Sequence, residues 1–217
     1  MKSFDLVVFD CDGVLVDSEG LSCQCLVDVL GQHGVAIEFD QAFERFLGRS
    51  SSAVDDYYLA ATGVRLPTQF RSDMLSRLTS VFERSLKLMP HVRAVLDATH
   101  LPYCLASSSD PERIRMTLSV ARLAPYFDGR IFSGSMVEHS KPAPDLFLLA
   151  AAKMGATPAK TLVVEDSVNG VLAGKAAGMT VWGFVGGSHY SGRDGRRLLA
   201  EAGADRVFDS MADFWTS

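Results

Sequence analysis

The sequence lacks an excess of positive charge and any long apolar run. Its 21 lysine and arginine residues are outnumbered by 26 aspartate and glutamate residues, which gives a formal net charge of −5. Because nucleic-acid binding draws on a surplus of basic residues, we expect no nucleic-acid partner. No apolar stretch approaches the roughly 20 residues of a membrane-spanning helix, and the N-terminal residues predict no signal peptide, so we expect no membrane partner either.

Cysteine is also scarce, with four residues at positions 11, 23, 25 and 104. Cys23 and Cys25 stand two apart on an expected helix, so their side chains point to different sides and are poorly placed to share a metal ion. Buried thiols in a reducing compartment are the simpler interpretation, and we expect a cytoplasmic protein. The five histidines show no spacing typical of a metal site. His139 lies near Lys141 in the sequence, but we expect it at the surface.

What is present is an alternation of short apolar runs with helix-like segments. The apolar runs cover residues 6–10, 103–107, 130–134, 161–166, 180–185 and 205–209. Helices are expected at 90–99, 110–121, 144–155 and 167–178, the second with Asp110 as N-cap and Pro111 in its first turn. This alternation predicts an α/β protein whose core is a Rossmann-like, mainly parallel sheet with helices on both faces.

The first interval is too long for this rhythm. Asp12 and Ser107 are 95 positions apart, whereas a strand–helix–strand unit needs roughly 30 or more residues. Apolar residues in the excess segment recur at helical spacing, as in Leu21, Cys25 and Val29. We therefore predict a small α-helical cap at residues 18–85, inserted into a catalytic core made of residues 1–17 and 86–217. Two linkers would join the parts, as a lid over a site requires.

Polar residues stand where several of the expected strands end. Ligands of parallel α/β sheets bind beyond the carboxyl ends of the strands, so these residues could meet in one cleft. They are Asp10, Asp12, Ser107, Glu165 and Asp166, with Lys141 in a loop that enters a helix. Each alone is compatible with an ordinary turn, and Asp-Gly is a frequent turn sequence. "DCDG" also resembles the start of a calcium loop, but Val14 and Leu15 occupy positions that need an oxygen ligand and a glycine.

Three of these segments favour phosphate and cation chemistry. The loop "SSSDPE", which begins at Ser107, leads into a helix N-terminus, where free N–H groups suit a phosphate; an N-capping loop with nothing bound is equally compatible. Lys141 is held between two prolines, although most lysines are simply solvated. In "VVEDSVNG" the adjacent acids Glu165 and Asp166 end an apolar strand. Burying both is costly unless a cation is present.

Taken together, these segments resemble the haloacid dehalogenase-like hydrolase superfamily, in its phosphatase branch. "DCDGVLVDSE" is similar to the first motif of that family, "LASSS" to the second, "SKPAPDLF" to the third and "VVEDSVNG" to the fourth, in the family's order. The helical insert after the first motif resembles the family's small helical cap. The family includes sugar-phosphate and 6-phosphogluconate phosphatases and β-phosphoglucomutase-like proteins.

The resemblance implies a role for each of these residues. Asp10 would be the nucleophile that forms an aspartyl-phosphate, and Asp12 would protonate the leaving alcohol and then deprotonate the attacking water. Mg²⁺ would be held by the Asp10 carboxylate, the Asp12 backbone carbonyl and Asp166, with Glu165 in support. The phosphoryl oxygens would be bound by Ser107, Ser108 and Lys141. Gly13 would let the chain turn closely around the site, and Cys11 would point away into the packing.

Departures from the family pattern separate its branches. Dehalogenases of the family lack the second acid, so Asp12 argues against halide removal. β-Phosphoglucomutases carry a histidine where Ser22 stands, and a lysine and an arginine where this chain has Leu47 and Ser51; Arg49 is nearby but offset. The phosphonate-hydrolysing branch uses a cap lysine, and the sequence has no lysine between Lys2 and Lys87.

The favoured hypothesis is a Mg²⁺-dependent phosphatase of small phosphorylated metabolites, such as sugar phosphates or sugar-acid phosphates including 6-phosphogluconate. The alternatives are a phosphomutase, a phosphoaspartate signalling domain and a binding module that has lost activity. Arg49 and Ser50 are candidates for contacting the substrate from the cap. Residues 186–195, rich in glycine, are expected to form a plain loop rather than a partner surface. We expect a monomer or a weak homodimer.

Overall fold

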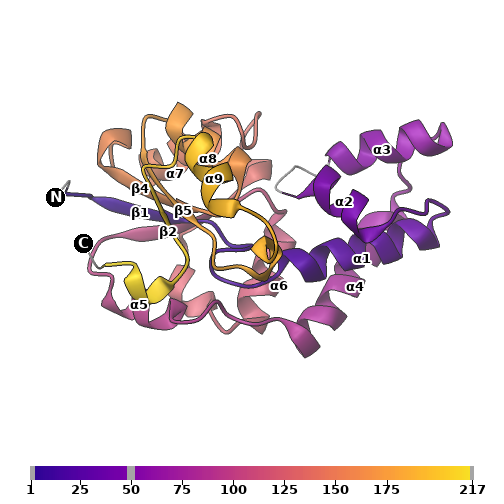
Figure 1. Cartoon of the computed structure of the whole chain (residues 1–217), viewed down its shortest axis with the longest axis horizontal. Helices are drawn as coiled ribbons and strands as arrows, with labels where there is room; N and C mark the ends of the chain where they lie inside the picture. Colours follow the sequence, from indigo (N-terminus) through magenta and orange to yellow (C-terminus); the bar gives the residue numbers. More distant parts are fainter. Residues whose placement is uncertain (1–2, 48–51, 216–217) are drawn as a thin grey trace.

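The computed structural model describes residues 3–47 and 52–215 (Figure 1). In the described residues the core is a six-stranded parallel sheet with the strand order β3-β2-β1-β4-β5-β6. All six apolar runs expected from the sequence form strands, so the predicted α/β fold with a parallel sheet is confirmed. The strands are β1 (Leu6–Phe9), β2 (Tyr103–Ser107), β3 (Ile131–Ser133), β4 (Thr161–Glu165), β5 (Thr180–Phe184) and β6 (Arg206–Phe208).

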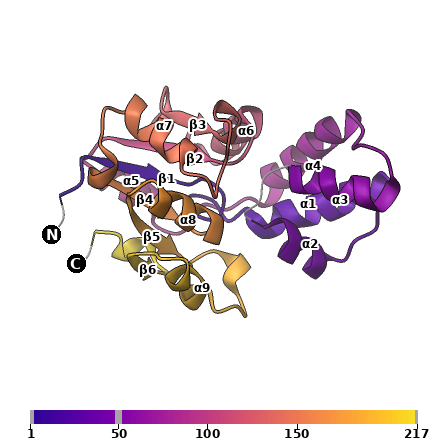
Figure 2. The same cartoon turned by 90° about the horizontal axis from the view of Figure 1, so that it is seen from above.

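Helices cover both faces of the sheet (Figure 2). Because side chains alternate along a strand, Val7 and Phe9 of β1 pack into one apolar cluster, and Leu6 and Val8 pack into another. The first cluster includes residues of α5 (Val92–Ala98) and α6 (Pro111–Val120). The second includes residues of α7 (Asp145–Lys153), α8 (Val168–Ala176) and α9 (Gly195–Glu201). This double burial explains why the central residues of the strands are apolar.

Two details of the helices differ from the expectation. Helix α9 has no counterpart in the sequence analysis; it begins after Asp194, whose side chain accepts a hydrogen bond from the Arg197 backbone N at 3.1 Å. Asp110 does occupy the N-cap position of α6, but its side chain makes no capping hydrogen bond. Short 3₁₀ helices connect the elements: η1 (Ala124–Phe127), η2 (Gly134–Met136), η3 (Pro158–Lys160), η4 (Ser188–Tyr190) and η5 (Met211–Asp213).

Four helices between β1 and α5 form a group to one side of the sheet (Figure 2). We call them the cap helices: α1 (Glu19–Gln32), α2 (Phe39–Phe46), α3 (Ser52–Thr62) and α4 (Gln69–Ser85). They enclose an apolar cluster of their own, which includes Leu30, Tyr58 and Phe70. That residues 18–85 form a domain of their own stays a prediction. Over residues 3–47 and 52–215, none of the helices has both the length and the apolar character that a membrane crossing needs.

The two connections between the sheet and the cap helices run side by side. The backbone N of Asp17 donates to the Lys87 carbonyl at 2.9 Å, and the backbone N of Met89 donates to the Leu15 carbonyl at 3.0 Å. The chain therefore leaves and re-enters the core at one place, next to the end of β1. The four cysteines are free thiols; Cys23 is half-buried and the other three are buried.

Candidate active site

Two pairs of acids meet where the strand order reverses. Asp10 and Asp12 follow β1, while Glu165 ends β4 and Asp166 follows it; β1 and β4 are neighbours in the sheet. One carboxylate oxygen from each of Asp10, Glu165 and Asp166 lies within 4.8 Å of the others, and all three residues are buried. Such a switch point is where ligands of open α/β sheets bind. The structure thus brings together three of the four acids whose convergence the sequence predicts, Asp10, Glu165 and Asp166.

Lys141 reaches into this acidic cluster from the segment before α7. Its Nζ donates to Asp10 Oδ1 at 2.7 Å, to Glu165 Oε1 at 2.5 Å and to the Ala106 carbonyl at 2.9 Å. Burial alone would lower the pKa of Lys141, but the two carboxylates outweigh it and raise the pKa above its usual value. The amine therefore stays charged and links the ends of β1, β2 and β4.

The acidic cluster suits a divalent cation. Burial, with repulsion from Glu165, raises the pKa values of Asp10 and Asp166 well above their usual range, so these carboxylates need more positive charge than Lys141 supplies. Carboxylate oxygens are the donors that Mg²⁺ prefers. Gly13, at a φ of +76°, lies against the cluster: a Cβ there would stand 1.7 Å from Asp166 Oδ2. The prediction that the chain needs glycine at this turn therefore agrees with the geometry.

Asp12 is turned toward three donors that the sequence analysis did not name as site residues. Ser18 Oγ donates to Oδ1 at 2.6 Å, Ser109 Oγ donates to Oδ2 at 3.0 Å, and Arg113 Nη2 donates to Oδ1 at 3.1 Å. Burial works against the charged form, but the Arg113 guanidinium and these hydrogen bonds hold the pKa of Asp12 below its usual value. In this conformation Asp12 is an ionised carboxylate next to the acidic cluster.

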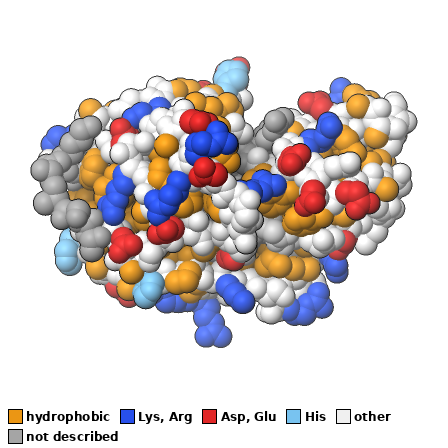
Figure 3. Space-filling view, in the orientation of Figure 1, with side chains coloured by type: hydrophobic (Ala, Val, Ile, Leu, Met, Phe, Trp, Pro, Cys, Tyr) orange, Lys and Arg blue, Asp and Glu red, His pale blue; other side chains and the backbone are white. Residues whose placement is uncertain are grey.

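The expected phosphate loop lines the same cavity. Ser107 is buried at the end of β2, and its Oγ accepts a hydrogen bond from the Ser109 backbone N at 3.1 Å. Ser108 is half-buried, with its Oγ 3.4 Å from Ser140 Oγ. The cavity has a volume of about 830 Å³ and lies between the core and the cap helices, where the surface is hollowed (Figure 3). Asp10 and Lys141 also line it.

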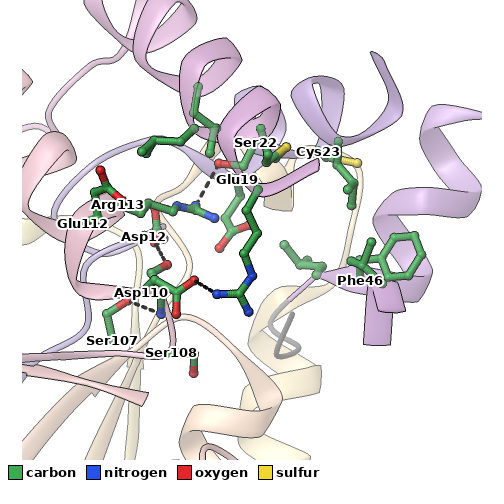
Figure 4. Close-up of a pocket in the computed structure, with 18 of the residues that line it drawn as sticks. Asp12, Glu19, Ser22, Cys23, Phe46, Ser107, Ser108, Asp110, Glu112 and Arg113 are labelled. Carbon is green, nitrogen blue, oxygen red and sulfur yellow. Dashed lines mark hydrogen bonds and ion pairs between the residues drawn. The ribbon is translucent and has the colours of Figure 1, made fainter. Parts of the chain in front are cut away.

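The cap helices supply the other wall (Figure 4). Glu19, Ser22 and Cys23 of α1 and Phe46 of α2 face the cavity. Burial and the charges of Asp166 and Asp12 raise the pKa of Glu19 to about 8. Ser22 Oγ accepts a hydrogen bond from Arg113 Nη2 at 3.0 Å, which connects α1 to α6. Arg49, Ser50 and Ser51 lie outside the described residues.

Residues 186–195 are not a plain loop, because they reach the acidic cluster. His189 Nε2 lies 3.1 Å from Asp166 Oδ2, and the Tyr190 hydroxyl donates to the Asp166 carbonyl. Arg193 places its guanidinium 4.3 Å from the centre of the Phe43 ring in α2. The sequence held one signal for this: the segment directly follows β5, whose carboxyl end lies at the same edge of the sheet as Asp166. His139 is exposed, as expected.

Comparison with known proteins agrees with this arrangement. The model of a family of hydrolases, the haloacid dehalogenase-like hydrolases, matches residues 4–178. The chain is 29% identical to 6-phosphogluconate phosphatase of Escherichia coli over 190 residues, which cover 87% of this chain and 86% of the relative. It is 33% identical to hexitol phosphatase B of the same organism over 177 residues, 79% of each chain.

A solved structure extends the likeness to the fold. A conserved haloacid dehalogenase-like protein of unknown function from Agrobacterium tumefaciens superposes with a TM-score of 0.78 at 35% identity, covering 98% of this chain and 96% of that one. The predicted enzyme class, a hydrolase, is confirmed by the family match. Since the match spans all four sequence motifs, the chain belongs to the haloacid dehalogenase-like hydrolases.

Proposed function

We propose that this hydrolase is a Mg²⁺-dependent phosphatase of small phosphorylated sugars or sugar acids, with 6-phosphogluconate among the candidates. The observation that carries the proposal is the convergence of a buried carboxylate, a charged amine and a second acidic pair at the switch point of the sheet. Asp10 Oδ1 is 2.7 Å from Lys141 Nζ, which also holds Glu165 at 2.5 Å. Attack at a phosphorus atom requires a nucleophile, and it requires positive groups that compensate the charge of the phosphoryl oxygens. These side chains, with a cation at the acidic pair, would supply both.

In the first step, Asp10 attacks the phosphorus atom and the bond to the leaving alcohol breaks. Mg²⁺ at Asp10, Asp166 and the Asp12 carbonyl, with Glu165 in support, would offset the repulsion between carboxylate and phosphate dianion. Lys141 stabilises negative charge on the phosphoryl oxygens from the core side. Ser107 and Ser108 donate hydrogen bonds to the same oxygens from the loop that precedes α6.

Asp12 acts as the general acid in the first step and as the general base in the second. It would give a proton to the departing alkoxide; because Asp12 is ionised while Ser18 and Arg113 contact it, it must first turn from them toward the substrate and take up a proton from solvent. It then removes a proton from the water that attacks the phosphorus of the aspartyl-phosphate, which restores Asp10 and releases inorganic phosphate. The names of the relatives, a 6-phosphogluconate phosphatase and a hexitol phosphatase, support a phosphorylated sugar as the substrate. A cavity of about 830 Å³ is ample for one.

Metal removal tests the proposal as a whole. We expect inorganic phosphate release from at least one sugar phosphate or sugar-acid phosphate with Mg²⁺ present, loss of release after chelation, and recovery when Mg²⁺ is added back. The measurement uses a panel of phosphorylated sugars, sugar acids and alditols. Each reaction is followed by a phosphate assay and by phosphorus NMR. Phosphate release that survives chelation would refute the metal requirement. Isomerisation of a sugar 1-phosphate without free phosphate would replace the phosphatase with a phosphomutase.

Substituting Asp12→Asn tests the proton carrier. With a sugar phosphate, we expect kcat to fall about 10²–10⁴-fold, because the alkoxide then leaves without a proton. With p-nitrophenyl phosphate, whose leaving group needs no proton, the first turnover should remain fast and give a burst of p-nitrophenolate equal to the enzyme present. The slow hydrolysis that follows reports the missing base. Equal losses in the first turnover of both substrates would contradict this role for Asp12.

A further inference from the structure

We propose that His189 and Tyr190 are positioning residues that hold Asp166 in the orientation in which it binds a divalent cation. This inference rests on the proposed function, in which Asp166 is a metal ligand. It concerns residues outside the four family motifs, in the segment after β5. Metal-binding carboxylates are themselves held by outer-shell partners, and losing such a partner costs metal affinity.

His189 contacts the carboxylate of Asp166. Its side chain is 1% exposed, and Nε2 lies 3.1 Å from Asp166 Oδ2. Nδ1 has no hydrogen-bond partner among the described residues, whereas Nε2 faces a carboxylate. The proton therefore belongs on Nε2, where it can hold Oδ2.

Tyr190 holds the backbone of the same residue. Its hydroxyl donates to the Asp166 carbonyl, and its ring lies against the His189 ring with centroids 4.3 Å apart. Asp166 is therefore held by hydrogen-bond partners at both its side chain and its main chain. A carboxylate fixed in this way keeps its oxygens in place when the cation leaves, which lowers the cost of binding it again.

The segment that carries both residues is itself fixed. The backbone N and Oγ of Ser188 both donate to Asp17 Oδ1, at 3.0 and 2.7 Å. Gly187 packs so closely that a Cβ there would stand 2.6 Å from the His189 ring. These contacts leave the imidazole little freedom to rotate away from Asp166. They also tie the segment to the linker that leads into the cap helices.

Metal binding measured without substrate tests the inference. Isothermal titration calorimetry of the full, metal-free protein with Mg²⁺, and with Mn²⁺ as a second probe, gives the affinity directly. We expect His189→Leu to weaken it about 10–100-fold. His189→Gln, whose amide nitrogen falls near the position of Nε2, should recover most of the affinity. The matched control is His139→Leu, at an exposed histidine, which should bind metal as the wild type does.

The outcomes separate this inference from the proposed function. A wild-type protein that binds neither Mg²⁺ nor Mn²⁺ removes the metal site and the proposed function with it. A wild-type protein that binds, together with a His189→Leu variant of unchanged affinity, overturns the inference alone. Equal weakening by Leu and Gln also overturns it, because the ring would then act through packing. If His189→Leu does not fold, Tyr190→Phe, which removes one oxygen, must weaken metal binding or the inference fails.

Discussion

Replacing Asp10 with asparagine is expected to abolish phosphate release. The amide has nearly the size and shape of the carboxylate and can still accept a hydrogen bond from Lys141, but it does not form an acyl phosphate. Removal of a nucleophile on which a covalent mechanism depends lowers the rate by at least about 10⁴-fold. The measurement is inorganic phosphate release under saturating Mg²⁺, with the melting temperature of the variant recorded alongside.

Trapping the covalent intermediate makes this prediction specific. Wild-type protein quenched in acid during turnover of a labelled substrate should carry label on the protein, and Asp10→Asn should carry none. Asp5→Asn is a suitable control because Asp5 is exposed and its side chain makes a 3.8 Å ion pair with the exposed Lys160. Phosphate release by Asp10→Asn at a rate near that of the control would remove Asp10 from the nucleophile role.

Replacing Lys141 with methionine is expected to lower the free energy of unfolding strongly. The Lys141 side chain is 3% exposed and contacts two buried carboxylates, Asp10 and Glu165. Removing one partner of a buried ion pair leaves uncompensated charge and costs about 3–5 kcal/mol of unfolding free energy. Urea denaturation in metal-free buffer measures the loss. Added Mg²⁺ should restore part of it, because a cation that binds only the folded acidic cluster stabilises that state.

A partly exposed lysine provides the comparison. Lys175 donates to both carboxylate oxygens of Asp205, at 2.8 and 2.7 Å, but about a third of each side chain is exposed. Lys175→Met should therefore cost at most about 1 kcal/mol. If the two lysine variants lost equal stability, the acidic cluster would not depend on Lys141 for its charge balance.

The sequence predicted the sheet well because its strands are buried on both faces. Residues 162–164 of β4, for example, are all apolar, and this run stands out without any knowledge of its neighbours. Helix α9 was missed because its placement depends on tertiary contacts: Leu199 packs against Gly183 of β5, two segments that local periodicity does not connect. Asp194, followed by the apolar pair Leu198 and Leu199, was a usable N-cap signal.

The acidic cluster was predictable for a topological reason. Asp10 follows β1 and Glu165 ends β4, and because these strands are parallel neighbours the two acids lie at the same edge of the sheet. The partners Arg113 and His189 were not predictable in this way. Arg113 meets Asp12 only because α6 lies beside the end of β1, and His189 meets Asp166 only through the conformation of residues 186–190. Neither contact can be predicted from the spacing of these residues in the sequence.

The separate apolar cluster of the cap helices has a consequence for how this chain can change. Leu30 and Phe70 belong to this cap cluster, whereas Val8 and Val163 belong to the apolar cluster on one face of the sheet. Energetic effects of substitutions in groups that share no partners add independently. We therefore expect that wall residues of the cap cluster, such as Leu26 and Phe46, can be exchanged for a new substrate with little effect on the acidic cluster, whereas Ser22 is tied to Asp12 through Arg113.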